Sequence, residues 1–324
     1  MSDSKQSTPS PTHLLPLTGK KIWITGHLGM LGSAVLRNLR KLDATLITTT
    51  RTQLDLTNQA AVYDWMEKNK PELIFHVGAK VGGIHANATL PDDFIRENLL
   101  IQTNVIDGAH RCGVSKLIFV ASNCTYPRNA PQPIDEDALL TGPLDENIRA
   151  YAISKIAGIE MCRSYRKQYG RDFISIIPPN LYGPGDNYHP QHSHVVAGIL
   201  RRTHEAKIEG RSELVVWGDG TPRRELLHVD DLAEAMQYLM RSSTSHDLYN
   251  VGSGHDLAIS ELATMISEIV GFKGKIVYDT QKPNGTMRKL LDSSRIRMLG
   301  WKPVIDENYG LRSAYANFLE TYST

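Results

Sequence analysis

Short apolar runs alternate with amphipathic stretches along the first half of the chain. The run Lys21–Thr25 ends in glycines, as a buried parallel strand does, and Met30–Leu42 has the spacing of a helix. A second helix is predicted from Tyr151 to Tyr169, where Gly170 ends it. Further strands are predicted over Ala44–Thr50, Leu73–Val77, Lys116–Val120 and Phe173–Ile177. Strands that alternate with helices predict an α/β fold with a doubly wound parallel sheet.

The pattern is less regular after Pro178, and this change predicts a smaller α/β lobe. A loop rich in Pro, Gly, His and Asn covers Pro178–His194, and a turn covers Gly218–Pro222. The elements predicted around them are helices over Val195–Lys207, from near Asp230, over Ile259–Val270 and over Ser294–Leu299, and a strand over Leu214–Trp217. We therefore expect a tail at residues 1–19, a main domain at residues 20–180 with about 228–253, and a lobe at residues 181–227 and 254–324.

Composition and charge exclude several classes of protein. The 324 residues carry 36 basic and 35 acidic side chains, and the net charge of +1 gives no attraction to nucleic acid or a membrane surface. Cys112, Cys124 and Cys162 lack CxxC spacing, which disfavours a disulfide framework or a zinc knuckle and suits a reducing compartment. No apolar run approaches the roughly 20 residues that span a bilayer. Met1–Gly19 is rich in Ser, Thr and Pro without an apolar signal core, so we expect a flexible tail, a fold that begins at Lys20 and a cytoplasmic protein.

Three glycines spaced three residues apart follow the first predicted strand: Gly26, Gly29 and Gly32. Glycine lets the backbone approach a pyrophosphate closely, and the N-terminus of the next helix offers free N–H groups to that anion. The alternative is a tight strand–helix turn without a ligand. The position of the glycines in a βαβ unit favours a Rossmann-type dinucleotide site.

The end of the second predicted strand distinguishes between cofactors. NAD sites place an Asp or Glu there for the ribose 2′-hydroxyl, whereas an Arg accommodates the 2′-phosphate of NADP. The sequence has Arg51 and no carboxylate at this point, which favours NADP, and Asp55 and Leu56 follow where the adenine ring would lie. The alternative is that Arg51 is an ordinary surface arginine.

Tyr151 and Lys155 lie one helical turn apart, so the phenol and the ammonium share one face of a helix. A free tyrosine ionises near pH 10, and a nearby cation lowers that pKa toward the range of a proton donor at neutral pH. The spacing by itself also fits an ordinary helix surface. Ser122 favours the catalytic interpretation because it follows the strand at Lys116–Val120, at the edge where α/β sheets bind ligands.

The glycine set, Ser122 and the Tyr151-x-x-x-Lys155 pair occur in the order typical of extended short-chain dehydrogenases/reductases, and the chain resembles that family. Stretches spread along nearly the whole chain are similar to those of the GDP-L-fucose synthase family. They are Ala79–Ile84, Ser122–Pro127, Asn180–Pro184, Ser193–His194, Val216–Gly218, His228–Asp231 and Asn250–Gly254. The resemblance implies NADPH-dependent conversion of GDP-4-keto-6-deoxy-D-mannose to GDP-L-fucose, by epimerisation at C3 and C5 and reduction at C4. It also implies a homodimer.

The resemblance assigns roles to individual residues. Tyr151 exchanges a proton with the reacting oxygen, Lys155 binds the nicotinamide ribose and tunes Tyr151, and Ser122 hydrogen-bonds the substrate carbonyl. Cys124 is implied as the base and His194 as the acid of the epimerisation, which needs pKa values near neutrality. Without the resemblance, Cys124 is more simply a small buried residue and His194 a loop histidine. The implied cofactor contacts are Gly26, Gly29, Met30, Leu31, Gly32, Arg51, Asp55, Leu56, Ala121, Lys155, Pro178, Asn180, Leu181 and His194.

A GDP-sugar carries a diphosphate, which basic side chains bind. Paired basic residues are usually solvated, but the resemblance implies substrate contacts by Arg202, Trp217, Arg224, Asn284 and Lys289. The sequence departs from the pattern of bacterial members at three positions. Leu28 stands where an Arg often grips the 2′-phosphate, which leaves Arg51 to act alone; Pro179 replaces a Thr near the nicotinamide, and Asn284 replaces an Asp near the nucleotide.

Other functions fit less of the sequence. A metal site at His189, His192 and His194 lacks fixed ligand spacing, and dehydration is disfavoured because Asn123 and Cys124 stand where dehydratases carry Asp-Glu. Formation of GDP-L-colitose from the 3,6-dideoxy-4-keto analogue stays open, with inversion at C5 alone. A catalytically silent NADP-binding regulatory protein is disfavoured because a silent relative need not keep the five catalytic groups.

Overall fold

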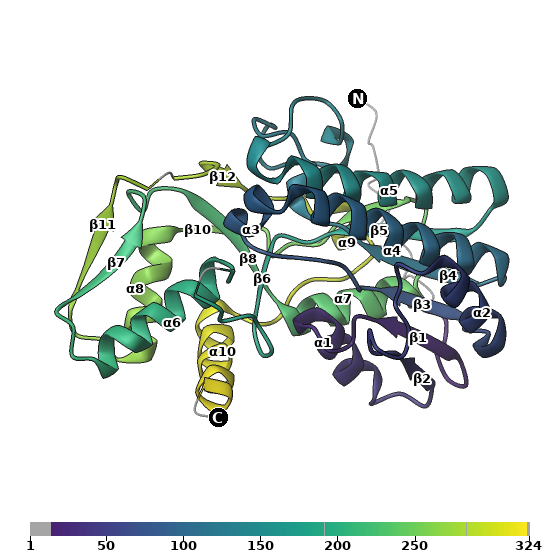
Figure 1. Cartoon of the computed structure of the whole chain (residues 1–324), viewed down its shortest axis with the longest axis horizontal. Helices are drawn as coiled ribbons and strands as arrows, with labels where there is room; N and C mark the ends of the chain where they lie inside the picture. The colour runs from purple at the N-terminus through teal and green to yellow at the C-terminus, as the bar shows by residue number, and fades with distance from the viewer. Residues whose placement is uncertain (1–13, 191, 283, 323–324) are drawn as a thin grey trace, which may run out of the picture.

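The computed structural model describes residues 14–190, 192–282 and 284–322. Within these residues the central layer is a six-stranded sheet with the order β2-β1-β3-β4-β5-β9, in which every pair is parallel (Figure 1). The sheet extends outward from β1 in both directions, so the predicted doubly wound α/β fold is confirmed. The strands are β1 Lys21–Thr25, β2 Thr45–Thr48, β3 Leu73–His76, β4 Lys116–Val120, β5 Asp172–Ile177 and β9 Leu248–Asn250.

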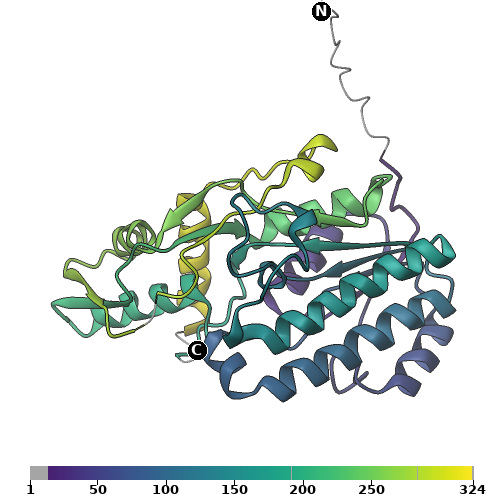
Figure 2. The same ribbon diagram turned by 90° about the horizontal axis from the view of Figure 1, so that it is seen from above.

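Helices cover both faces of this sheet, and Figure 2 shows the layers from above. Alternate side chains of β1 enter two apolar cores, because successive residues of a strand point to opposite faces. Ile22 and Ile24 pack with α1 and α7, whereas Trp23 packs with α2, α4 and α5. Burial on both faces explains why the strands read as continuous apolar runs. The helices are α1 Met30–Leu39, α2 Gln59–Asn69, α4 Pro91–Arg111, α5 Arg149–Tyr169 and α7 Val229–Arg241.

A second group of elements lies at the carboxyl side of the sheet. The strand β8 Arg223–His228 pairs with β6 Asn180–Tyr182, β10 Asp256–Ala258 and β12 Arg288–Lys289. A separate parallel pair joins β7 Glu213–Trp217 to β11 Lys275–Asp279. The helices α6 Val195–Ile208, α8 Ile259–Val270 and α10 Glu307–Tyr322 share a third apolar core. Short elements complete the described chain: α3 Ile84–Thr89, α9 Ser294–Met298 and the 3-10 turns η1 Asn123–Thr125, η2 Glu136–Ala138 and η3 Glu146–Ile148.

Several predicted boundaries differ from the observed ones. Helix α1 ends at Leu39 and not at Leu42, because the chain turns there and Leu42 packs back against the core. The edge strand β2 covers only the four residues that pair with β1. The stretch predicted as a loop from Pro178 to His194 contains β6, and β8 follows the predicted turn directly.

The described part of the N-terminal segment packs on the main domain. Leu17 is buried in the core beside α1, and the N–H of Leu15 donates to the carbonyl oxygen of Arg241 at 2.8 Å, so ordered packing begins before Lys20. The rest of the predicted tail, residues 1–13, lies outside the described residues. Ile296 and Trp301, which the sequence placed in the lobe, lie in the core of the main sheet because α9 packs against β9. No helix in the described ranges has the length and apolar character to cross a membrane.

Candidate active site

The glycine loop between β1 and α1 is shaped by close backbone contacts. Gly26 has φ +69°, and a Cβ there would lie 2.7 Å from Cα of Gly78. A Cβ on Gly32 would lie 2.0 Å from the Gly26 carbonyl oxygen, so the first turn of α1 packs directly on the loop. Gly29 precedes α1 and has more room, since its Cβ would come no nearer than 3.5 Å to another atom.

The N-terminus of α1 fits a pyrophosphate. The first N–H groups of a helix, here those of Met30 and Leu31, have no partner within the helix, and the first turn of α1 carries no acidic residue. Thr25 holds the loop against the neighbouring strand, because its Oγ1 accepts from the N–H groups of Val77 at 3.1 Å and Gly78 at 2.8 Å. The residues present therefore fit a dinucleotide cofactor.

The residues after β2, which the sequence predicts to contact the adenosine half of a cofactor, lie on the loop between β2 and α2. Arg51 is 74% exposed, and its Nη2 lies 3.5 Å from Oε2 of Glu97. The Asp55 carboxylate accepts from the N–H of Thr57 at 3.0 Å and from its hydroxyl at 2.8 Å, which lowers the pKa of Asp55. The carbonyl oxygen of the next residue, Leu56, accepts from the amide of Asn104 at 2.9 Å.

The remaining implied cofactor positions line the ends of β4 and β5. The N–H of Ala121 donates to the Ile176 carbonyl oxygen at 2.9 Å, which continues the pairing of the two strands. Pro178 follows β5, and Asn180 and Leu181 belong to β6. Leu28, which stands in the glycine loop, is 74% exposed.

Ser122, Cys124 and Lys155 gather beyond the carboxyl end of β4. Ser122 caps the turn η1, and its Oγ accepts from the N–H of Cys124 at 3.4 Å. The Lys155 ammonium reaches from α5 to the carbonyl oxygen of Val120 at 2.9 Å and lies 4.8 Å from the ring centre of Phe119. The sequence motif and the fold thus bring α5 and the β4 loop to one place.

Tyr151 lies at the start of α5 on the same side as Lys155. Its ring centre is 5.9 Å from Nζ of Lys155, and its ring makes an edge contact with Phe94, with ring centres 6.1 Å apart. Burial raises the pKa of the Tyr151 phenol, and interaction with Cys124 raises it further. From the sequence, Lys155 was expected to lower this pKa. The structure differs because the ammonium is directed to Val120 and burial has the larger effect.

Burial also shifts the pKa values of Lys155 and Cys124. It lowers the pKa of Lys155 to about 8, and it raises the pKa of the Cys124 thiol. Other interactions lower the pKa of that thiol, among them the charge of Lys289, the hydrogen bond with Ser122 and the charge of Lys155. The thiol is therefore less acidic than the near-neutral base expected from the sequence.

His194 stands at the start of α6, across the loop that follows β3. It keeps exposed surface, yet the protein around its imidazole lowers its pKa. A Cβ on Gly83 would lie 3.2 Å from the carbonyl oxygen of the preceding Ser193, and a Cβ on Gly82 would lie 3.1 Å from the Phe94 ring. His194 is thus connected to Tyr151 through this loop and Phe94.

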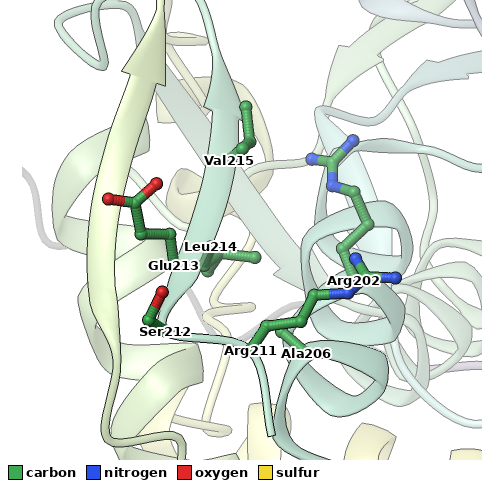
Figure 3. A pocket seen from close by; sticks show the side chains of 7 residues that line it. All are labelled: Arg202, Ala206, Arg211, Ser212, Glu213, Leu214 and Val215. Atoms are coloured by element: carbon green, nitrogen blue, oxygen red, sulfur yellow. The ribbon is translucent and has the colours of Figure 1, made fainter. Parts of the chain in front are cut away.

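Arg202 and Trp217 meet at the junction of α6 and β7. The guanidinium of Arg202 lies 5.5 Å from the ring centre of Trp217, which is 59% exposed and also faces Lys282 at 5.7 Å. Nε of Arg202 is buried and has no hydrogen-bond partner among the described residues. Arg202, Arg211 and Val215 line a cavity of about 390 Å³. Figure 3 shows Arg202 on α6 facing Val215 on β7 across it. A guanidinium with a buried N–H that lacks a hydrogen-bond partner, beside a cavity, is suited to an anionic ligand.

The other implied substrate residues come from β8, from β12 and from the segment that precedes β12. Arg224 and Lys289 are paired in register between β8 and β12, and burial lowers the pKa of both. Asn284 follows β11 in the sequence and contacts the turn that follows β7. Its side-chain oxygen accepts from the N–H of Asp219 and its amide donates to the Asp219 carboxylate, both at 2.9 Å. The charge of Lys289 acts on Cys124, whereas Nη2 of Arg224 lies 3.5 Å from the position that a Cβ on Gly285 would take, next to Asn284.

Three contacts of this site were not found from the sequence. They are the Phe94 ring against Tyr151, the bond between Thr25 and His76 at 3.0 Å, and the Lys282 ammonium over Trp217. Only Thr25 carried a signal, since it directly precedes Gly26. Among the described residues, no group of three or more His, Cys, Asp or Glu side chains could hold a metal ion, and the rings of His189 and His192 stack at 4.4 Å instead.

Several known proteins are similar to this chain along nearly its whole length. The protein named probable GDP-L-fucose synthase 1 from Oryza sativa subsp. japonica is 51% identical over 93% of each chain. GDP-L-colitose synthase from Yersinia pseudotuberculosis is 34% identical, covering 92% of this chain and 98% of its own. A solved GDP-L-fucose synthetase from Naegleria fowleri bound to NADP is 25% identical with a TM-score of 0.88, covering 97% of this chain and 98% of that one. Residues 22–252 match the NAD dependent epimerase/dehydratase family, and this chain therefore belongs to it.

Proposed function

We propose that this protein is an NADPH-dependent enzyme that converts GDP-4-keto-6-deoxy-D-mannose to GDP-L-fucose, by epimerisation at C3 and C5 and reduction at C4. The observation that carries the proposal is the convergence of Cys124, Tyr151 and Lys155 beyond β4, at the sheet edge that also holds the glycine loop. The relative named for the fucose product is 51% identical and the relative named for the colitose product is 34% identical, which favours the fucose product.

The main domain holds the cofactor. Gly26, Gly29 and Gly32, with the N–H groups of Met30 and Leu31, bind the pyrophosphate. Arg51 pairs with the 2′-phosphate, and Asp55 and Leu56 border the adenine. The bound cofactor supplies the hydride that reduces C4. The nicotinamide half is bordered by Ala121, Lys155, Pro178, Asn180, Leu181 and His194.

Epimerisation uses a base and an acid on opposite faces of the sugar ring. The 4-keto group acidifies the protons on C3 and C5, so Cys124 removes each proton as a thiolate. Burial opposes this ionisation, while the ammonium groups of Lys289 and Lys155 favour it. Burial keeps the imidazole of His194 neutral, and its N–H gives a proton to the other face. Each inversion leaves Cys124 with one proton more and His194 with one fewer, so the thiol releases a proton to solvent and His194 takes one up before the second inversion.

Reduction needs a proton for the oxygen on C4. The raised pKa of Tyr151 keeps its phenol protonated, which is the form that donates. Lys155, with a pKa of about 8, is mainly charged at neutral pH and stabilises the phenolate that the transfer leaves. Ser122 donates a hydrogen bond to the same oxygen and holds the carbonyl in place.

The lobe binds the nucleotide end of the substrate in this proposal. Arg202, Arg224 and Lys289 offer cations to the diphosphate, and Trp217 offers an exposed ring to the base. The unpartnered Nε of Arg202 supports this assignment. We further propose that residues 20–180 with about 228–253 act as the NADP-binding domain, with the remainder after residue 180 as the substrate lobe, except for the segment of Ile296 and Trp301 that packs in the main core.

We also propose that the protein acts as a homodimer in the cytoplasm. The exposed apolar side chains of Leu100 on α4 and Ile153 on α5 support contact between copies through these two helices. Sedimentation equilibrium of the whole chain tests the assembly.

The reaction is tested by incubating the protein with NADPH and GDP-4-keto-6-deoxy-D-mannose in D2O and examining the product by NMR. We expect NADPH oxidation and deuterium at both C3 and C5. Faster turnover of the 3,6-dideoxy analogue, with deuterium at C5 alone, would assign the colitose product instead. No NADPH oxidation with either sugar would contradict the enzymatic function and favour a silent cofactor-binding protein.

A further inference from the structure

Three charged side chains connect the loops that follow β3 and β2. Nζ of Lys80 lies 2.7 Å from Oε1 of Glu97, and Oε2 of Glu97 lies 3.5 Å from Nη2 of Arg51. Lys80 follows β3, Arg51 follows β2, and Glu97 belongs to α4. β1 lies between β2 and β3 in the sheet (Figure 1). The chain of ion pairs Lys80–Glu97–Arg51 therefore passes the carboxyl end of β1, where the glycine loop begins.

Glu97 is held firmly in this chain of ion pairs. Its side chain is 13% exposed, and the Lys80 ammonium that it binds is also fixed by Asp93 at 2.9 Å. The buried amide of Asn98 accepts from the Lys80 N–H at 2.9 Å and donates to the Lys80 carbonyl oxygen at 3.0 Å, which fixes the backbone as well. The carboxylate of Glu97 therefore has a defined position beside the end of β2.

Arg51 is held loosely by comparison. It is 74% exposed, and its contact with Glu97 is a single long one of 3.5 Å. Leu28, in the glycine loop, is 74% exposed and offers no charge to a phosphate. The binding of a 2′-phosphate thus depends on an exposed guanidinium that already faces a nearly buried carboxylate.

The charge of Glu97 affects the two cofactors differently. A phosphate that pairs with Arg51 must draw the guanidinium away from Glu97 and lie near a charge of its own sign, which weakens the phosphate's binding. The ribose 2′-hydroxyl of NAD carries no charge and meets no such repulsion. An acidic side chain beside the 2′ position is also the feature that NAD sites use.

We propose that Glu97 is a cofactor-specificity residue, which competes with the 2′-phosphate for Arg51 and so narrows the preference of this protein for NADPH over NADH. This inference rests on the proposed function for the place of the adenosine ribose beside Arg51. It concerns binding at that ribose and leaves the sugar chemistry unchanged.

The test is calorimetric titration of the whole protein with NADP+ and with NAD+, without a sugar. Glu97→Gln is expected to bind NADP+ about 3-fold more tightly, the size of one partly exposed ion pair, and NAD+ with unchanged affinity. The gain should shrink at high salt, because salt screens exposed charges. The matched control is Asp92→Asn on the same helix, an 83% exposed acid that contacts Arg96, and it should leave both affinities unchanged.

A second background shows whether Glu97 acts through Arg51. In Arg51→Met, the change Glu97→Gln should raise NADP+ affinity by less than about 1.5-fold, because no guanidinium remains to compete for and only the direct repulsion between Glu97 and the phosphate is removed. Glu97→Asp keeps a charge beside Lys80 but shortens its reach to Arg51, so it should give a smaller gain and serves if Glu97→Gln does not fold. An unchanged NADP+/NAD+ ratio in both Glu97 variants, or a full gain without Arg51, would overturn the inference. A wild-type protein that binds neither cofactor contradicts the proposed function instead.

Discussion

Two neighbouring glycines of the cofactor loop should fail for different reasons when each is replaced by alanine. In Gly32→Ala the new methyl carbon would lie 2.0 Å from the carbonyl oxygen of Gly26, which is 1.4 Å short of ordinary contact at 3.4 Å. Its next neighbours are the carbonyl carbon of Gly26 at 2.6 Å and Cα of His27 at 2.8 Å. All three are backbone atoms, so α1 itself must move away from the loop.

The magnitude follows from two opposing effects. Overpacking of this kind costs about 1–3 kcal/mol, and the greater helix propensity of alanine returns up to about 1 kcal/mol. The expected net loss is about 1–2 kcal/mol, which lowers Tm by about 2 °C in a chain of this length. Gly29→Ala meets nothing nearer than 3.5 Å at a φ of −80°, so it should leave the cofactor-free stability within about 0.5 kcal/mol.

For cofactor affinity, Gly29→Ala should be the more damaging of the two changes. The methyl group of Gly29→Ala occupies the surface that a pyrophosphate approaches, so we expect a loss of about tenfold or more in NADPH affinity. Thermal unfolding without cofactor and calorimetric titration with NADPH measure the two effects separately. A Gly32→Ala protein as stable as wild type, or a Gly29→Ala protein with unchanged NADPH affinity, would refute this account of the loop.

Three further predictions concern the catalytic groups and the lobe. Tyr151→Phe should slow NADPH oxidation at least about 100-fold while deuterium exchange at C3 and C5 continues, and an equal loss of both would count against the division of roles. Because burial raises the pKa of Cys124, the rate of deuterium exchange should rise with the thiolate fraction between pH 7 and 9. Lys289→Met removes a charge that favours the thiolate, so it should slow this exchange at each pH. A flat pH profile would exclude Cys124 as the base. Burial raises the pKa of Glu225 from 4.5 to about 7, so its ionisation should cost the folded state up to about 3 kcal/mol as pH rises through this interval. Glu225→Gln removes the ionisable group and should flatten the fall of Tm with pH. An unchanged slope of Tm against pH would contradict this.

The main sheet was predictable because its strands are buried on both faces. Lys116–Val120 and Lys21–Thr25 have the predicted bounds, since each forms a continuous apolar run between turn residues. The strand β8 was missed because it begins with Arg223, Arg224 and Glu225. Glu225 is buried there because its carboxylate accepts backbone N–H groups from distant loops, and such a contact leaves no apolar pattern in the sequence.

The membership of the candidate site was more predictable than its electrostatics. Spacing placed Tyr151 and Lys155 on one face of a helix, and the strand pattern placed Ser122 at the sheet edge. The pKa directions depend on burial by side chains from other elements, such as Phe94, whose distance along the chain gives no local signal. Glu97 was likewise not predicted, because it meets Arg51 across 46 positions of sequence.

The burial of the cysteines bears on the resistance of the protein to oxidants. Peroxides oxidise thiolates, so a thiol whose pKa is raised is slow to form sulfenic acid. Burial raises the pKa of Cys112, Cys124 and Cys162, the last to about 12. The resting protein therefore keeps its thiols in their least oxidisable form. Cys124 becomes vulnerable when it ionises, so oxidative inactivation should be slow at neutral pH and should become faster as pH rises.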